Sequence, residues 1–524
     1  MQPLDPPRTI RVRILINFWN YIRDYFLRPF VHLFFPSLWV EPTDENGVRI
    51  KPTSAIPGPN IWLPVLGDAL TLNKIGGPPR FLDYISSLHE KYGPIVKTKL
   101  GPQKFLFVNH PIFYKEIIRN EPKCPASFKL PAGEAFYRRH KINRGLFFQD
   151  GEMWHQNRAL LTQLILKETG RYMETLLDSV DGVLTKVVEN WKSKSMENDD
   201  RLIRNVEHDC YELFISSIMV MTFGRHYEMF LSQAGSNVTT LANIAIKLND
   251  TTFDLNAYPI QIATVLRLKA WEKYQEYTLQ NLRTGRKCTD IALEAMGTGG
   301  SLEEYGLLHR LKNVCNASDE EIRLHCTDFC TDISDPFSLT SLWTLYALGR
   351  NPDVQDKILK EIERVCGAGA VVRYKDLEKL PYLNATCKEV LRMYPTAPLI
   401  IRKHDEDVVI GGFKIPSDYI VTLSTFVSHK NPLYFYNPEK FWPERWMWEE
   451  RDDETRERKR SEDAYYPFGI GKRTCAGKLI AQNLMRLYVA KVVQTFVVES
   501  DEVGTKIKIM LYPDGDMNIK LKPR

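Results

Sequence analysis

Apolar residues recur at three- and four-residue spacing over most of the chain, as they do along one face of an α-helix. With helix-starting and helix-ending residues at their edges, such stretches predict helices over Phe81–Lys91, Met153–Leu166, Tyr172–Lys192, Val206–Phe223, Ala270–Met296, Asp319–Leu348, Pro352–Val365, Pro381–Tyr394 and Lys478–Phe496. Short β-type runs predict strands over Ile95–Lys99, Lys104–Asn109, Asp407–Ile410, Tyr419–Ser424 and Thr505–Leu511. The pattern predicts a mainly α-helical domain with a small sheet whose strands come from both ends of the chain.

A proline-rich segment separates the first part of the chain from the rest. Ile56-Pro57-Gly58-Pro59 cannot continue a helix and is typical of a stiff, extended connector. We therefore expect a leader over residues 1–55 and one folded domain over residues 56–524, with no internal repeat of roughly 20 to 50 residues.

The leader is apolar and rich in arginine. Apolar residues are dense from Ile14 to Val40, but Arg23, Asp24 and Arg28 interrupt them, and a helix that spans a bilayer needs about 20 apolar residues. Many arginines with few acidic residues are typical of an organelle transit peptide. A helix that lies on a membrane surface is the alternative.

Composition limits the kinds of partner and compartment. With 44% hydrophobic and 26% charged residues, the chain has the balance of an ordinary folded protein, and a net charge of +5 gives no reason to expect nucleic acid as a partner. Nine cysteines without a paired spacing favour a reducing compartment. No Gly-rich turn joins a predicted strand to a helix, which argues against a dinucleotide site.

The segment from Phe468 to Gly477 contains a cysteine in a setting suited to metal binding. Glycines at positions 471 and 477 let a loop approach a bound group closely while backbone N–H groups face the sulfur of Cys475. A helix that begins near Lys478 would direct its positive N-terminal end at the thiolate and lower the pKa of Cys475. The alternative is an inert cysteine packed at a helix start.

The spacing in this segment is highly specific. The pattern Phe-x-x-Gly-x-Arg-x-Cys-x-Gly has a random chance of about one in ten million per starting position, and it resembles without a gap the signature of the cytochrome P450 family. The resemblance implies the helix-rich P450 fold, haem b as the cofactor and Cys475 as the iron ligand, a thiolate that favours O–O cleavage. We expect Arg473 to contact a haem propionate, Phe468 to pack against the ring and Gly477 to allow close approach.

Two further pieces of sequence match the family in the expected order. Glu389 and Arg392 lie three apart on one face of a predicted helix, which alone describes a commonplace surface pair. Pro443-Glu444-Arg445-Trp446 follows, and in the family such pieces form a buried Glu-Arg-Arg cluster that fixes the haem loop. The resemblance thus implies that Glu389, Arg392 and Arg445 come together.

The propionate contacts are also implied by the resemblance. Trp154 and Arg158 lie four apart on one helical face, and the family uses a Trp-x-x-x-Arg pair there to hold a propionate. Arg402 matches a third contact at the start of a strand. Arginine suits this task because it stays charged and forks onto a carboxylate.

The helix predicted over Asp319–Leu348 departs from the family pattern. In the family a long helix crosses the haem and carries Ala/Gly-Gly-x-Asp/Glu-Thr, whose acid and hydroxyl hold water for proton delivery to oxygen. Asp335 matches the acid, but Pro336 stands where threonine is expected, offers neither a hydroxyl nor an N–H, and is expected to open the helix. Thr331, one turn before Asp335, and Ser338 are candidates to supply the hydroxyl.

Three functions follow from these residues. The resemblance favours a monooxygenase, an oxidoreductase that uses O₂ and relays protons through Asp335 with Thr331 or Ser338. If Pro336 abolishes that relay, the same fold would serve as an isomerase or dehydratase that needs no external electrons. The third alternative is a haem binder without catalysis.

A monooxygenase of this composition needs electrons from a separate protein. Lys388, Lys472 and the basic run Arg456–Arg460 lie near the haem loop in sequence and suit an acidic ferredoxin, although a solvated loop is the alternative interpretation of the run. Mitochondrial members of the family use two basic residues on this helix for ferredoxin, and here Asn384 stands at the first of these positions.

The stretch from Tyr137 to Arg158 resembles the mitochondrial branch of the family most, and within it the ecdysteroid 2-hydroxylases of arthropods. The resemblance implies a small apolar substrate of steroid type, a role in ecdysteroid biosynthesis, and association with the inner mitochondrial membrane. The endoplasmic reticulum membrane is the alternative location.

Overall fold

The chain forms two compact units, which a computed structural model describes over residues 50–60, 66–143, 145–146, 148–166, 171–197, 199–256, 259–297, 306–332, 334–447 and 461–524. The smaller unit holds residues 50–56 with Asp407–Pro416, and the larger holds residues 57–406 and 417–524. Most of the predicted leader lies outside the described residues, so its nature stays a prediction.

The smaller unit is built around a hairpin. Strands β4 (Val408–Ile410) and β5 (Phe413–Ile415) pair antiparallel and are joined by Gly411 and Gly412, both at positive φ. The Lys51 N–H donates to the Gly412 carbonyl at 2.8 Å. The short helix η3 (Thr53–Ala55) follows that contact.

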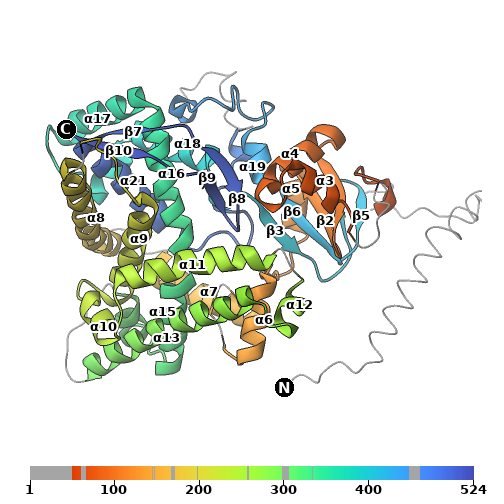
Figure 1. The fold of residues 1–524 in the computed structure, drawn as a ribbon, viewed down its shortest axis with the longest axis horizontal. Helices are drawn as coiled ribbons and strands as arrows, with labels where there is room; N and C mark the ends of the chain where they lie inside the picture. Colours follow the sequence, from red (N-terminus) through yellow and green to blue (C-terminus); the bar gives the residue numbers. More distant parts are fainter. Residues whose placement is uncertain are drawn as a thin grey trace, which may run out of the picture. The chain divides into compact units, whose positions relative to one another are not determined.

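Helices make up most of the larger unit (Figure 1). They are α3 (Ala69–Ile75), α4 (Phe81–Tyr92), α5 (Pro111–Arg119), α6 (Pro131–His140), α7 (Gly151–Leu161), α8 (Arg171–Glu197), α9 (Val206–Phe223), α10 (Tyr227–Gln233), α11 (Val238–Asn256), α12 (Ile260–Val265), α13 (Lys269–Gly297), α14 (Leu307–Asn313), α15 (Asp319–Asp332), α16 (Ser334–Arg350), α17 (Pro352–Cys366), α18 (Pro381–Met393), α19 (Thr425–His429) and α21 (Lys478–Thr495), with short turns η4 (Pro78–Arg80), η5 (Thr162–Leu166), η6 (Tyr374–Lys379) and η7 (Pro443–Trp446). This confirms the prediction of a mainly helical fold.

The small sheet joins strands from distant parts of the chain, as predicted. Its order is β1 (Ile95–Leu100), β2 (Gln103–Val108), β6 (Tyr419–Leu423) and β3 (Ile400–Lys403), and β2 and β6 run parallel. A second pair is formed by β7 (Phe496–Ser500) and β10 (Ile519–Pro523).

One predicted strand is wrong. The stretch Thr505–Leu511 contains a turn, so that β8 (Gly504–Ile507) and β9 (Leu511–Asp514) pair antiparallel as a hairpin. The apolar residues of this stretch belong to two short strands of a hairpin and not to one continuous strand. Periodicity over so few residues does not distinguish the two arrangements.

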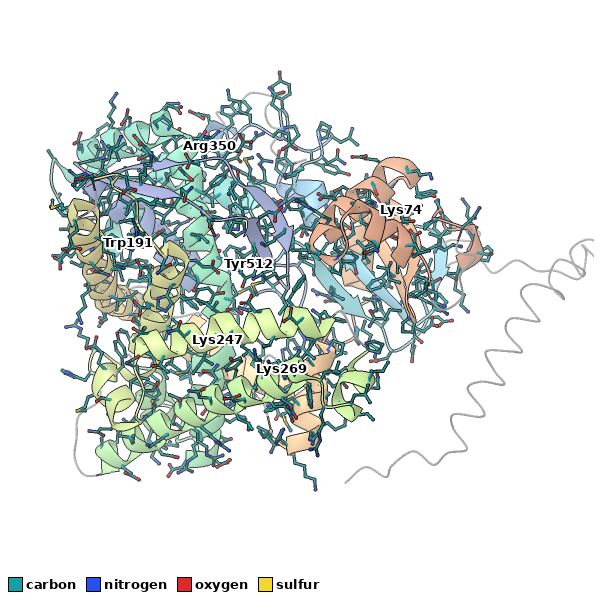
Figure 2. All side chains as sticks on the ribbon, in the orientation of Figure 1. Lys74, Trp191, Lys247, Lys269, Arg350 and Tyr512 are labelled. Carbon is teal, nitrogen blue, oxygen red and sulfur yellow. The ribbon has the colours of Figure 1, made fainter. Side chains whose placement is uncertain are left out.

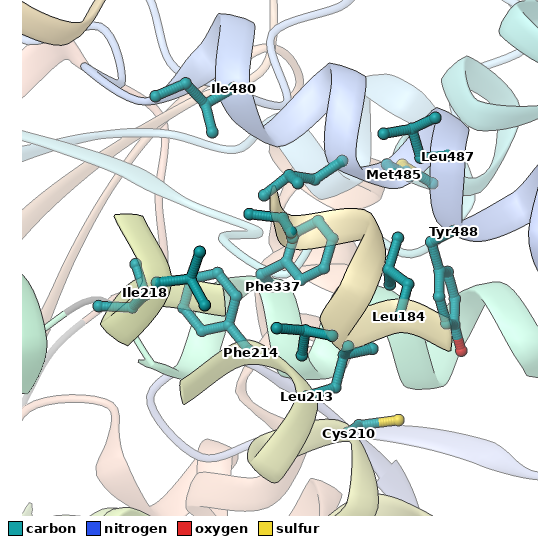
Figure 3. Close-up of a cluster of buried hydrophobic side chains, with 14 of the residues drawn as sticks. Leu184, Cys210, Leu213, Phe214, Ile218, Phe337, Ile480, Met485, Leu487 and Tyr488 are labelled. Atoms are coloured by element: carbon teal, nitrogen blue, oxygen red, sulfur yellow. The ribbon is translucent and has the colours of Figure 1, made fainter. Parts of the chain in front are cut away.

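The main hydrophobic core lies between α8, α9, α16 and α21. Figure 3 shows Leu184, Phe214, Phe337 and Tyr488 gathered there, one from each of these helices. The rings of Phe214 and Phe337 stack with centroids 5.1 Å apart. Buried Trp191 of α8 (Figure 2) donates its indole N–H to the Asp209 carboxylate. The later turns of α21 are packed in this core, and this packing fixes the position of its N-terminal end.

Candidate functional site

Cys475 lies in a tightly turned segment directly before α21. Gly469 and Gly471 both adopt a φ of +79°, which glycine tolerates without strain. The backbone closes on itself, because the Cys475 N–H donates to the Phe468 carbonyl at 2.8 Å and the Thr474 N–H donates to the Gly471 carbonyl at 3.1 Å. The segment thus holds the sulfur beside the first turn of α21.

The Cys475 thiol is reachable yet poorly hydrated. Among the nine cysteines, all within the described part of the chain, it alone has an exposed side chain. The surrounding protein nevertheless displaces enough water to raise its pKa, while the Gly477 N–H and the charges of Arg158 and Lys478 act to lower it. The predicted net lowering is therefore wrong for the chain alone, because desolvation outweighs the helix end and the cations. A metal ion at the sulfur would reverse that balance by deprotonating the thiol.

Arg473 is held by the segment that precedes α7. Its Nε donates to the Pro125 carbonyl at 2.8 Å, and its Nη2 donates to the Gln149 carbonyl at 2.9 Å and to Asp150 Oδ1 at 3.0 Å. Its guanidinium lies over the Trp154 ring, with Cζ 3.8 Å from the centroid. Desolvation lowers the pKa of Arg473 to about 10, and the charge of Asp150 opposes this.

The carboxylate of Asp150, a residue that the sequence did not predict as part of the site, accepts hydrogen bonds from Arg473 and from two further residues. The two further donors are the Ser127 N–H at 2.9 Å and the Lys129 ammonium. Burial acts to raise the pKa of Asp150, but these two donors and the Arg473 charge outweigh burial and lower it. Nothing in the local sequence marks Asp150, because its partners lie in two other segments, one near Ser127 and one at Arg473.

Helix α7 brings Trp154 and Arg158 to the cysteine segment. Trp154 is buried, and Arg158 donates from Nη2 to the Thr474 carbonyl at 2.8 Å, one residue before Cys475. Desolvation lowers the pKa of Arg158, and the charge on Cys475 opposes that effect. A tryptophan, two arginines and the thiol therefore lie together although they come from positions about 320 residues apart.

Arg402 reaches the same segment from β3. Its Nη2 donates to the Ile470 carbonyl at 2.6 Å, and its Nε donates to Glu121 Oε1 at 2.5 Å. The Arg402 side chain is buried, so its charge is matched by a carboxylate that sequence reasoning did not find.

These residues fit the haem implied by the sequence. A Cβ at Gly477 would meet no atom of the described residues within 4 Å, whereas one at Gly471 would clash with Glu121, so the described part of the chain leaves space beside Gly477, two residues after the thiol. The donor set consists of a thiol for iron and of guanidinium and indole N–H groups for carboxylates. Phe468 is half-buried against the main core and lies in the same segment.

The predicted Glu-Arg-Arg cluster is present and buried. Glu389 Oε1 and Oε2 accept hydrogen bonds from Arg392 at 2.9 and 3.0 Å, and Arg445 Nε donates to Oε1 at 3.0 Å. The Trp442 N–H and the Trp446 indole N–H also donate to this carboxylate, each at 2.9 Å. Five donors on one buried carboxylate compensate for its desolvation.

His429 links the cluster to the cysteine segment. Its Nδ1 lies 3.2 Å from the Arg392 carbonyl, and the Tyr466 N–H donates to its Nε2 at 3.2 Å, two residues before Phe468. Desolvation lowers the pKa of His429 to about 3. The ring is therefore neutral, with its proton on Nδ1.

The helix predicted over Asp319–Leu348 is covered by α15 and α16, and residue 333 between them lies outside the described residues, so the opening of the helix by Pro336 stays a prediction. Pro336 is itself helical, as the third residue of α16. The Thr331 side chain lies outside the described part, and Ser338 is buried. The described structure therefore does not test the three residues as a relay.

Asp335 stands near a buried tyrosine pair that sequence reasoning missed. The hydroxyls of Tyr211 and Tyr512 lie 3.0 Å apart, and Asn249 Nδ2 donates to Tyr211 at 3.2 Å. Burial first, and then the charge of Asp335, raise the pKa of both tyrosines. The two tyrosines lie 301 residues apart, so no local pattern predicts that they meet.

Of the residues predicted to meet an electron donor, Lys388 and Lys472 are described, and the Lys472 ammonium donates to the Glu121 and Pro122 carbonyls. Lys388 lies on α18 with Nζ 5.6 Å from the centroid of the Trp446 ring, close to the Glu389 cluster. The run Arg456–Arg460 lies outside the described residues.

Comparison with known proteins identifies relatives over almost the whole chain. The sequence model described as Cytochrome P450 matches residues 56–520. The chain is 26% identical over 485 residues to "Cytochrome P450 315a1, mitochondrial" of Drosophila melanogaster, covering 90% of this chain and 89% of that protein.

Two mammalian relatives match at similar levels. The "1,25-dihydroxyvitamin D(3) 24-hydroxylase, mitochondrial" of Mus musculus is 26% identical over 482 residues, covering 90% of this chain and 89% of its own. The "Cholesterol side-chain cleavage enzyme, mitochondrial" of Ovis aries is 24% identical over 480 residues, covering 90% of each chain.

Proposed function

The chain belongs to the cytochrome P450 family, and we propose that it is a mitochondrial monooxygenase that hydroxylates a steroid-type substrate with electrons from a ferredoxin. As a member of this family it is an oxidoreductase whose cofactor is haem b. The observation that carries the proposal is the exposed Cys475 thiol, held before α21 with Arg158, Arg402 and Arg473 around its segment.

We assign the haem contacts to side chains already in place. Bound haem supplies the redox chemistry, and a thiolate ligand favours cleavage of the O–O bond. Cys475 would ligate the iron, while Phe468 would pack against the ring and Gly477 would leave room for it. The propionates would be bound by Trp154, Arg158, Arg402 and Arg473.

A steroid-type substrate is proposed from two sources. Mammalian relatives are named for action on dihydroxyvitamin D and on cholesterol; the first is derived from a sterol and the second is a sterol. The stretch from Tyr137 to Arg158 resembles the arthropod ecdysteroid 2-hydroxylase Shadow, which supports an ecdysteroid as the first candidate to test.

The proton relay is proposed to run through Asp335 with a hydroxyl from Thr331 or Ser338. Asp335 lies in the first turn of α16, and Ser338 follows three residues later on the same side of the helix. Mutation of Thr331 and Ser338 together to alanine should lower the fraction of consumed oxygen that appears in product. Unchanged coupling in this double variant would refute the relay.

A second candidate function rests on Pro336. Because it replaces the hydroxyl-bearing residue of the family pattern, the chain has an alternative as an isomerase or dehydratase that needs no external electrons. A haem binder without catalysis is the third candidate. The three differ in their need for reductant and in turnover, so one experiment separates them.

The electron donor is proposed to bind near Lys388. A basic side chain on the surface of α18, next to the Glu389 cluster that supports the cysteine segment, suits an acidic ferredoxin. Arg456–Arg460 would extend the same surface.

Location in mitochondria is proposed from the leader and from the names of the relatives. Within the described part of the chain, no helix is both long and apolar enough to cross a bilayer. Ile262, Val265 and Leu266 at the end of α12 are exposed next to Arg267, which supports contact with the surface of the inner membrane. The endoplasmic reticulum membrane is the alternative.

The test is reconstitution with ferredoxin, ferredoxin reductase and NADPH in the presence of steroids. A monooxygenase incorporates oxygen from ¹⁸O₂ only when reductant is present. An isomerase converts its substrate without reductant, and a haem binder binds carbon monoxide but turns nothing over. A folded, ferrous protein that lacks the red-shifted Soret absorption of a thiolate–carbon monoxide complex would refute ligation by Cys475.

A further inference from the structure

Glu121 lies two residues beyond α5 and places a buried carboxylate against the cysteine segment. The residue is 7% exposed, and its side chain is 1% exposed. A carboxylate at that depth is costly unless its oxygens accept strong hydrogen bonds. The groups that donate hydrogen bonds to the Glu121 carboxylate therefore indicate the role of its charge.

Each oxygen of Glu121 holds a different part of the site. Oε1 accepts the hydrogen bond from Arg402 Nε at 2.5 Å, and Oε2 accepts one from the Lys472 backbone N–H at 3.1 Å. The Lys472 ammonium returns to the Glu121 and Pro122 carbonyls at 3.3 and 2.9 Å. The carboxylate thus joins β3 to the segment that ends at Cys475.

Arg402 closes the arrangement into a ring. While its Nε binds Glu121, its Nη2 donates to the Ile470 carbonyl at 2.6 Å. The chain from Ile470 to Lys472 is consequently held at both ends by one ion pair. Arginine can do this because its donors form a rigid fork, which lysine lacks.

Gly471 supplies independent support, because it sits inside this ring. A Cβ at Gly471 would lie 2.6 Å from Glu121 Oε2 and 2.8 Å from Ile118 Cδ1, and its φ is +79°. Glycine at this position of the motif is therefore required in part by Glu121. The Glu121 carboxylate can approach this closely only because position 471 has no side chain.

We propose that Glu121 is a positioning residue for the haem site, which orients the Arg402 guanidinium and fixes the backbone from Ile470 to Lys472 so that Cys475 meets the iron as a thiolate. It touches neither substrate nor cofactor and acts through Arg402 and the Lys472 N–H. This inference rests on the proposed function as far as haem is concerned, but the clamp on the segment does not.

The experiment compares Glu121→Gln with the control Asp463→Asn. The glutamine side chain would keep the shape of the glutamate but lose the charge, and its amide NH₂ would face a donor. Asp463 forms an ion pair with Lys115 at 2.7 Å, which also joins α5 to the chain before Cys475, but both side chains are substantially exposed. The control therefore removes a solvent-exposed ion pair that lies outside the ring.

Two readouts are taken on the full-length protein. Hydrogen exchange of the peptide that contains residues 470–475 is expected to be roughly tenfold faster in Glu121→Gln than in the wild type, because a charge-assisted hydrogen bond is lost. Transfer of haem to apomyoglobin should also be roughly tenfold faster, and part of the ferrous carbon monoxide absorption should move from the thiolate to the thiol position. Asp463→Asn should change neither readout by more than about twofold.

Glu121→Asp provides a second test if the glutamine variant does not fold. It keeps the charge but withdraws the carboxylate by one methylene, so Arg402 and Lys472 cannot both be reached, and faster exchange of residues 470–475 is again expected. Exchange and haem transfer at the wild-type rate in a folded Glu121 variant would overturn the proposal, as would equal effects in Asp463→Asn. If the wild type itself binds no haem, the proposed function fails, and the exchange readout still decides whether Glu121 clamps the segment.

Discussion

Acid should destabilise this protein partly through His429, and the effect can be isolated with His429→Gln. The neutral ring accepts the Tyr466 N–H on Nε2, so protonation of Nε2 would set two N–H groups against each other in a buried site. Desolvation lowers the pKa of His429 to about 3 from an ordinary value of 6.5. At pH values between these two pKa values, His429 is therefore protonated in the unfolded chain and neutral in the folded chain.

The sign and size of the effect follow from linkage. The stabilising contribution is complete above pH 6.5 and declines as the pH falls toward 3, because the unfolded state gains the proton first. Between pH 7 and pH 5 the loss is about 2 kcal/mol for a shift of this size. His89, whose pKa burial lowers to about 4, adds a loss in the same direction, so the wild-type slope alone does not report on His429.

The assay is urea unfolding at pH 7 and pH 5, followed by circular dichroism and extrapolated to zero denaturant. His429→Gln should be less stable than the wild type at pH 7, but its further loss on going to pH 5 should be smaller by about 2 kcal/mol. The control is His226→Gln at an exposed position, which should leave the wild-type pH dependence intact. If His429→Gln loses as much stability as the wild type between the two pH values, the reasoning about the neutral ring is refuted.

Further outcomes follow from the same contacts. Cys475→Ser should abolish the red-shifted carbon monoxide absorption and product formation while far-ultraviolet circular dichroism remains that of the wild type; retained thiolate absorption would exclude Cys475 as the ligand. Arg392→Leu should lower the free energy of unfolding by about 3–5 kcal/mol, measured by urea denaturation, because it strands Glu389 in a buried site. Lys388→Glu should raise the KM for ferredoxin several-fold at low salt and less at high salt, whereas an unchanged KM would place the partner elsewhere.

Much of the architecture could be predicted from periodicity. Helices α9, α17, α18 and α21 begin and end close to the predicted residues, because long apolar stripes bounded by proline or glycine leave few other solutions. Helix α11 (Val238–Asn256) was missed, since threonines and asparagines interrupt its apolar face. The hairpin of β8 and β9 was read as one strand for lack of a glycine or proline in its turn.

Only those residues of the candidate site that belong to spaced sequence motifs could be predicted. Arg158 and Arg402, which the motif spacing singled out, contact the segment that carries Arg473 and Cys475, and Glu389, Arg392 and Arg445 form the implied cluster. The carboxylates that neutralise the arginines, Glu121 and Asp150, had no sequence signal. A buried acid is identified by what surrounds it, and its neighbours come from segments joined only by the tertiary fold.

The pKa of Cys475 shows the same limit. The helix end and the cations that act to lower it could be read from the sequence, but the larger opposing effect, loss of water around the sulfur, depends on how densely the folded chain packs there. The local sequence predicts in which direction each contact shifts the pKa of Cys475, but it does not predict which effect is larger.

The parallel pairing of β2 with β6 constrains how this protein can be made. Lys104 lies opposite Tyr419, so the ribosome must add about 300 residues after the first strand emerges before its neighbour exists (Figure 1). At roughly 5–20 residues per second this interval lasts about 15–60 s, during which β1 and β2 present an unpaired edge. Nascent chains should therefore depend on chaperones that shield that edge, and ribosome stalling before residue 419 should leave aggregation-prone fragments rather than a folded N-terminal half.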